Sequence, residues 1–172
     1  MFDRDYELVG KHASIVKFFV NDIKIFPYYI DVYKTAAVFG LLHNKTAKRD
    51  KDSKDDATIP AGVFVNHRSE CMIIYRLVML LEKSRGLTAE QRIDRAFRDD
   101  AEEGDSEQLA KNMEVFNSYV RGGLEVMKER FLDGCSSDDD YLRRTMERFQ
   151  EFKNLNDDIP LEDSIAEILN NV

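Results

Sequence analysis

Apolar side chains recur at helical spacing along most of this chain, separated by short polar interruptions. Residues three or four positions apart share one side of an α-helix, so this pattern is typical of amphipathic helices. We therefore expect an all-α protein, a compact bundle of about six to seven helices. Its length suits one domain with a real core, so we expect residues 1–172 to form a single helical domain.

Two helices are predicted in the first 43 residues. The apolar spacing within 5–20 predicts the first, despite Gly10. The second is predicted to start near Pro27, because a missing N–H is harmless in a first turn. On it, the small pair Ala36 and Ala37 would let a neighbouring helix approach closely.

A change of composition follows the second helix. Residues 44–60 contain almost no large apolar residue before Ile59, so we expect one long polar, mobile surface loop. The segment after it, 62–66, is the one β candidate in the chain, and at most a short β segment is expected there. The helix predicted over 70–85 has apolar residues around more than half its circumference, which indicates a central buried helix.

A charged segment, "QRIDRAFRDD", belongs to a helix predicted over 89–100. Thr88 and Gln91 have the spacing of a capping box, in which each side chain bonds the backbone N–H of the other residue. Its acids and arginines four positions apart are expected to pair along an exposed face.

The longest apolar stripe predicts a helix over 106–132, and Gly122 and Gly123 within it imply a kink or a close approach by another backbone. Two further helices are expected after it, one beginning at 138–140 and a short last one within 160–171. Their predicted inward residues are Leu142, Met146, Phe149 and Phe152 on the first, and Ile165, Ile168 and Leu169 on the second.

The formal net charge of −8 disfavours a general nucleic-acid or anionic-membrane binder. The charge is uneven, however. The first 86 residues carry 14 Lys and Arg against 11 Asp and Glu, and the other 86 carry 11 against 22. A basic patch in the first half is therefore compatible with the acidic total.

Cys71 and Cys135 lie far apart in different contexts, which fits reduced thiols in the cytosol better than a disulfide framework. The acidic N-terminal segment does not resemble an export signal. The longest apolar run, 71–81, is 11 residues long and contains Arg76, well short of the roughly 20 that span a bilayer. We expect a cytoplasmic protein with no membrane contact.

No metal or cofactor motif is complete. Residues 50–56 resemble the start of a calcium loop, but Lys54, Asp55 and Ala61 occupy positions that need a ligand, a glycine and a glutamate. His67 and Cys71 are four apart, yet no second pair completes a tetrahedral site. We predict no catalytic residue, no cofactor and no metal.

Three other features have plain structural interpretations. Glu151 and Lys153 resemble the end of a nuclease motif that requires a strand, but they lie in a predicted helix. Tyr28, Tyr29 and Tyr33 could stack nucleobases, although their spacing favours core or interface aromatics. The three histidines, His12, His43 and His67, are scattered, and each is read as a surface or packing residue.

One family resemblance can be stated. The succession "YIDVYKTAAVFGLL", a polar loop, "IPAGVF", "YRLVMLLE" and later "YVRGGLEVMKERF" resembles small helical accessory proteins found beside bacterial DNA phosphorothioation (dnd) and related phage-defence genes. It covers about residues 26–131. The resemblance implies an accessory role in a DNA modification or defence system, and it implies no site residues.

The sequence therefore favours a non-catalytic interaction subunit that binds one or more larger protein subunits and contacts nucleic acid at most indirectly. The alternatives are a direct nucleic-acid binder and an unrecognised enzyme or effector. Self-association is plausible through the helix at 106–132. Candidate partner or nucleic-acid contacts are Arg92, Arg95, Arg98, Lys45, Lys48, Arg49 and Lys51, together with Lys54.

Overall fold

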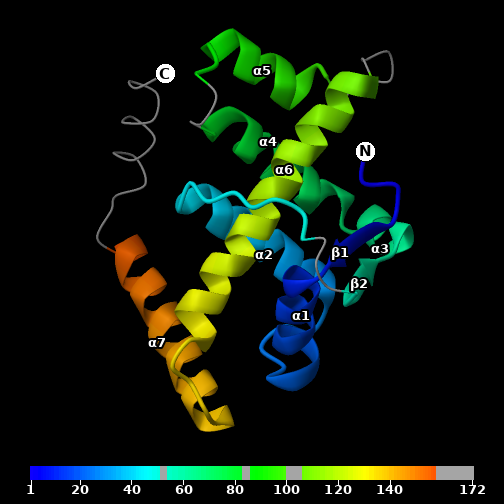
Figure 1. The fold of residues 1–172 in the computed structure, drawn as a ribbon. Helices are drawn as coiled ribbons and strands as arrows, with labels where there is room; N and C mark the ends of the chain where they lie inside the picture. Colours follow the sequence, from blue (N-terminus) through cyan, green and yellow to red (C-terminus); the bar gives the residue numbers. More distant parts are fainter. Residues whose placement is uncertain (51–53, 83–85, 100–105, 158–172) are drawn as a thin grey trace. The chain divides into compact units, whose positions relative to one another are not determined.

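The computed structural model describes residues 1–50, 54–82, 86–99 and 106–157 (Figure 1). Its elements are, in order, β1 (Tyr6–Val9), α1 (Lys11–Lys17), the π-helical turn η1 (Phe18–Asp22), α2 (Tyr29–Leu42), β2 (Asp56–Ile59), α3 (Ala61–Asn66), α4 (Arg68–Leu81), α5 (Ala89–Phe97), α6 (Ser106–Met127), the π-helical turn η2 (Lys128–Leu132) and α7 (Asp138–Asp157). A mainly helical fold with a short β segment is thus confirmed. The predicted last helix, within 160–171, lies outside the described residues.

Contacts within the chain group it into two compact units, Met1–Arg130 and Phe131–Val172. The second contains α7, and the first contains the elements from β1 to α6. Each unit is described by itself below. The expectation of one domain over 1–172 stays a prediction.

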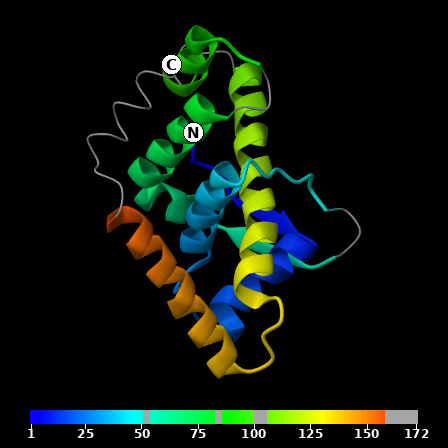
Figure 2. The same ribbon diagram turned by 90° about the vertical axis from the view of Figure 1, so that its left-hand side faces the viewer.

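The first unit is built on α2 and α6, which lie side by side in both views (Figures 1 and 2). A Cβ on Gly123 would lie 1.7 Å from the carbonyl oxygen of Ala36, and one on Gly40 would lie 2.0 Å from that of Tyr119. Only a residue without a Cβ permits two backbones to come this near. The predicted close approach at Ala36 and at the glycine pair of α6 is therefore confirmed.

Residues 44–50, here called the strap, cross α6 after α2 ends (cyan in Figure 1). Ala47 N donates to the carbonyl oxygen of Ser118 at 2.9 Å, and Arg121 Nε donates to that of Ala47 at 2.9 Å. A Cβ on Gly122 would lie 2.1 Å from the carbonyl oxygen of Lys45, so the strap rests directly on the helix. Hydrogen bonds to the strap backbone hold it in place, and a count of large apolar residues cannot reveal them.

β2 follows the strap within the predicted polar loop and pairs antiparallel with β1, Tyr6 opposite Ile59. Ala57 and Ile59 are buried, so the expectation of an unstructured loop over 44–60 is wrong for these residues. The predicted strand at 62–66 is also wrong, because these residues belong to α3, which begins immediately after Pro60.

The first predicted helix is shorter than expected. Residues 6–9 form β1, and α1 begins only after Gly10, whose φ of 62° is rarely adopted by other residues. Leu8 is buried by the strand pairing and not by a helix face. A strand of four residues shows too little apolar–polar alternation to be recognised beside the longer helical pattern that follows it, so the sequence favours a helix over these residues.

The central buried helix is α6, not α4. Phe116, Tyr119, Val120, Leu124 and Met127 of α6 are all at most 1% exposed. On α4, by contrast, Ile73, Leu77 and Leu81 are 60%, 44% and 43% exposed. The apolar residues of α4 encircle the helix, but neighbouring helices cover only part of its circumference.

In the second unit, α7 begins at the three aspartates, as predicted. Ser137 Oγ accepts a hydrogen bond from Asp140 N, and the Asp140 carboxylate accepts one from Ser137 Oγ. The inward positions predicted on this helix are wrong, because Leu142, Met146 and Phe149 are 59%, 64% and 63% exposed. A periodic stripe predicts that a helix has an apolar face, but it does not predict that another element covers that face. The side chain of Phe152 lies outside the described residues.

Candidate interaction site

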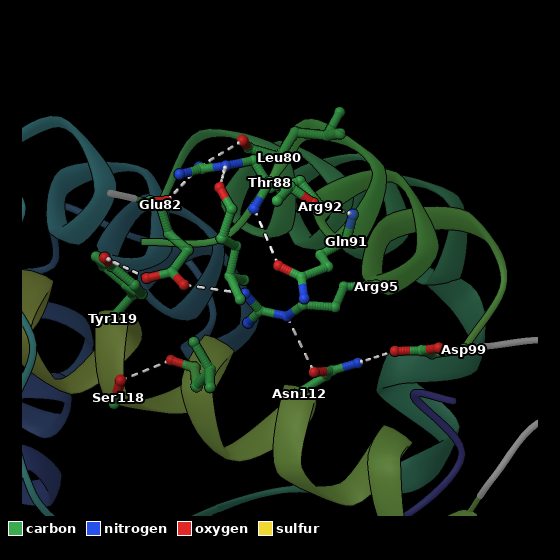
Figure 3. Close-up of polar contacts among 12 residues, drawn as sticks. Leu80, Glu82, Thr88, Gln91, Arg92, Arg95, Asp99, Asn112, Ser118 and Tyr119 are labelled. Atoms are coloured by element: carbon green, nitrogen blue, oxygen red, sulfur yellow. Dashed lines mark hydrogen bonds and ion pairs between the residues drawn. The ribbon is translucent and has the colours of Figure 1, made fainter. Parts of the chain in front are cut away.

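α5 begins with the predicted capping box, which the structure confirms. Gln91 N donates to Thr88 Oγ1 at 3.3 Å, and Thr88 N donates to Gln91 Oε1 at 3.0 Å (Figure 3). The helix packs against α4, and both lie beside the N-terminal half of α6 (Figure 1). This arrangement fixes where the predicted arginine contacts lie.

Arg95 points into the protein and forms a buried ion pair. Its Nη1 lies 2.9 Å from Glu82 Oε1, and the two side chains are 8% and 0% exposed. Arg95 Nε also donates to Asn112 Oδ1 of α6 at 3.1 Å, and Asn112 Nδ2 donates to Asp99 at 2.7 Å (Figure 3). Arg95 therefore connects α5 to α6 and is closed to a partner.

The side chain of Arg92, a residue of α5, reaches the C-terminal end of α4 and donates hydrogen bonds to backbone carbonyl oxygens there. Its Nη1 donates to the carbonyl oxygens of Leu80, at 3.0 Å, and Glu82, and its Nε donates to that of Leu87 at 3.3 Å. The last carbonyls of a helix have no intrahelical donor, so this guanidinium caps α4. The Nε and Nη1 groups of Arg92 therefore form hydrogen bonds within the protein.

Arg98 is the one of these three arginines that is well exposed, at 69% of its side chain, and it pairs with Asp94 four residues earlier. The candidate contacts Arg92, Arg95 and Arg98 therefore do not share one exposed face. The spacing is near one turn, but the helix packs so that the three side chains enter different environments.

α4 and α5 instead each expose a stripe of apolar side chains. Ile73, Leu77 and Leu81 follow one another at four-residue intervals on α4, and Ile93 and Phe97 of α5 are 44% and 49% exposed. Arg76 lies over the Phe97 ring, 5.1 Å from its centroid, so the stripes of the two helices adjoin. These five apolar residues and Arg76 are called the α4–α5 surface below.

The predicted basic contacts of the strap are exposed. Lys45, Lys48 and Arg49 all reach solvent, as does Lys54 just before β2, and Lys51 lies outside the described residues. Arg49 pairs with Glu7 of β1 at 2.6 Å. The strap therefore presents cations on the outer side of α6.

Three acids that could have formed a carboxylate cluster, Asp94, Asp99 and Glu125, have separate partners. Asp94, Asp99 and Glu125 contact Arg98, Asn112 and Lys11, respectively. Burial raises the pKa of the Cys71 thiol to about 11, which makes it a poor nucleophile. Within the described ranges, no three His, Cys, Asp or Glu side chains are grouped to hold a metal ion.

A titratable cluster that the sequence did not indicate joins α1 to α6. His12 is fully buried, and its Nε2 lies 3.3 Å from Glu125 Oε1, which also accepts Lys11 Nζ at 2.7 Å. Burial lowers the pKa of His12 despite this carboxylate. The four-residue spacing of His12 and Val16 with other core positions of α1 was the available signal for its burial.

Mild acid is expected to destabilise the first unit through His12. Because its folded pKa lies below the usual value of about 6.5, the unfolded chain takes up a proton first as the pH falls. This stabilisation is fully present above about pH 6.5 and is lost as the pH falls towards the folded pKa. Urea unfolding midpoints across this range measure the loss.

His12→Gln should flatten this pH dependence, since glutamine stays neutral and can still donate to Glu125. His67→Gln is the matched control, because the His67 side chain is 33% exposed and pairs with the exposed Glu70. An unchanged slope in His12→Gln would contradict the assignment.

No helix in the described residues combines the length and apolar character required to cross a membrane. No protein-family model, curated protein or solved structure matches the chain.

Proposed function

We propose that this protein is a non-catalytic, cytoplasmic accessory subunit that binds a larger protein through the α4–α5 surface. The observation that carries the proposal is the exposure of this surface. Large contiguous apolar patches are rare on monomeric proteins and commonly mark interaction sites.

The energetics of burial favour such an interface. Taking a fully exposed Leu, Ile or Phe side chain out of water contributes about 1.5–3 kcal/mol. The five apolar side chains of this surface are 43–60% exposed, so covering each one contributes about half of that, and together they can anchor a partner. Arg76, stacked on Phe97, adds a guanidinium of the type enriched at protein interfaces. The partner should present a complementary apolar groove or helix, with an acceptor for Arg76.

The resemblance to accessory proteins of DNA phosphorothioation and phage-defence loci supports a bacterial assembly of this kind. In it, the larger subunit would process nucleic acid, and this chain would contact nucleic acid indirectly. The strongly acidic second half of the chain agrees with an indirect role, because it repels phosphate.

The double variant Ile73→Asp, Leu77→Asp is expected to weaken partner binding at least tenfold, because it places two carboxylates in the apolar interface. The measurement is affinity purification of the tagged full chain from its native host, followed by titration of the identified partner. Leu42→Asp is the matched control, because Leu42 is 62% exposed but lies at the end of α2. Equal capture by the double variant and the wild type would refute the assigned surface.

Direct nucleic-acid binding is the second candidate, and the exposed cations of the strap favour it. An electrophoretic shift whose affinity falls steeply with salt, and which Lys45→Gln with Lys48→Gln removes, would support it over the first.

A further inference from the structure

A second feature of the first unit is a pocket of about 410 Å³ where η1, the start of α2, the end of β2 and α3 meet. Its volume lies in the range of small-molecule sites. None of the residues described as lining it is charged, although charged residues make up 34% of the chain. Apart from the His67 imidazole, the lining therefore offers no counter-charge to an ion, and the pocket suits an uncharged ligand.

The walls of the pocket are flat and apolar. Tyr28 and Tyr29 line it between Pro27 and Pro60, and Tyr28 is 66% exposed. Ile59 of β2 also lines the pocket and is only 1% exposed, so this part of the site belongs to the packed core. An exposed tyrosine ring on a rigid support provides a stacking surface for a planar ring.

Tyr28 differs from the neighbouring Tyr29 and Tyr33 in its exposure and its contacts. Tyr33 is 1% exposed and donates to Asn117 Oδ1 at 2.8 Å, which makes it a core residue. Tyr29 accepts a hydrogen bond from Asn21 Nδ2 at 3.1 Å, which fixes its position in the wall. Of the three, Tyr28 and Tyr29 line the pocket, and Tyr28 is the more exposed of these two.

The remaining lining groups named here are polar. Asn21, Asn66 and Thr58 carry amide and hydroxyl groups, which both donate and accept hydrogen bonds, and His67 adds an imidazole. A purely hydrocarbon ring would displace solvent from the exposed Asn66 and Thr58 without offering either a hydrogen bond, at a cost in affinity. A ring with donors and acceptors along its edge would use them.

We propose that this pocket binds an uncharged heteroaromatic ring of the nucleobase class, stacked on Tyr28 and read at its edge by Asn66 and Thr58. The site is separate from the α4–α5 surface and does not depend on the function proposed for that surface. It gives the protein a small-molecule or single-base binding activity in addition to partner binding.

The test is titration of the full chain with adenine, adenosine and cytidine, followed by two-dimensional NMR and calorimetry. The wild type should bind at least one of them saturably, with the resonances of Tyr28 and Asn66 shifting. Tyr28→Ala should weaken binding at least tenfold, and Tyr28→Phe, which keeps the ring, should retain it. Val63→Trp, which fills the pocket, should abolish binding while thermal unfolding reports that the fold is kept.

Phe149→Ala is the matched control, because Phe149 is an exposed aromatic residue of α7, at 63%. It should bind as the wild type does. Absence of saturable binding up to about 10 mM of each probe would overturn the proposal. So would equal affinity of Tyr28→Ala, or binding of a proline-rich peptide in place of all three probes.

Discussion

Replacing Glu82 by alanine is expected to lower the free energy of unfolding of the first unit by about 3–5 kcal/mol. The Glu82 carboxylate is fully buried and lies 2.9 Å from the Arg95 guanidinium, which is itself almost fully buried. Removing one member of a buried pair leaves the other charge desolvated without its counter-ion. Arg95 would keep its hydrogen bond to Asn112, but an amide oxygen does not neutralise it.

Urea denaturation of wild type and variant measures this loss. Asp94→Ala is the matched control, because it removes the exposed pair with Arg98 and should cost at most about 0.5 kcal/mol. Replacing both partners, Glu82→Leu with Arg95→Met, should recover most of the stability, because no buried charge then remains. A loss below about 1 kcal/mol in Glu82→Ala would contradict the role given to the pair.

The contrast between Arg95 and Arg98 explains why the candidate site was only partly predictable. Both arginines lie on one short helix whose start and charge pattern were predicted from the capping box and the spacing of acids. Their environments differ because Glu82 and Asn112 come from α4 and from α6. The sequence contains the spacing of the arginines but not the positions of the helices that pack around them.

Elements that depend on distant pairing were missed for a related reason. β1 pairs with β2, about fifty residues away, and neither strand is long enough to show a clear alternation. The strap is held on α6 by a backbone hydrogen bond from Ala47 to Ser118 and by the Arg121 side chain, and neither contact is indicated by the composition of the strap. Whether an apolar stripe is buried also depends on residues far away in the sequence. Leu77 and Met146 have the helical spacing of core residues, yet both are exposed.

The α2–α6 contact was, by contrast, readable from small residues. Ala36 and Ala37 on one segment and two adjacent glycines on another indicated that backbones come close, because a large side chain at these positions would prevent it. What remained open was which backbone approaches the glycines. The structure answers with two segments, since Gly123 meets Ala36 and Gly122 meets the strap.

Gly123→Ala is therefore expected to destabilise the first unit by about 3 kcal/mol or more. Two effects oppose each other at this position. Alanine in a helix interior is more favourable than glycine by about 1 kcal/mol, which would stabilise α6. The added Cβ, however, would lie 1.7 Å from a backbone oxygen of α2, and a backbone cannot rotate away as a side chain can. Separating the helices would disturb the whole α2–α6 interface, so the clash outweighs the propensity.

Gly62→Ala is the control that isolates the two effects. Gly62 lies in α3, and its added Cβ would meet nothing within 4 Å. This variant should be unchanged or more stable, by at most about 1 kcal/mol. Thermal unfolding of both variants should then move the melting temperature in opposite directions, or leave that of Gly62→Ala unchanged. A Gly123→Ala protein as stable as the wild type would mean that α2 and α6 do not pack backbone against backbone, and the strap over Gly122 would lose its support as well.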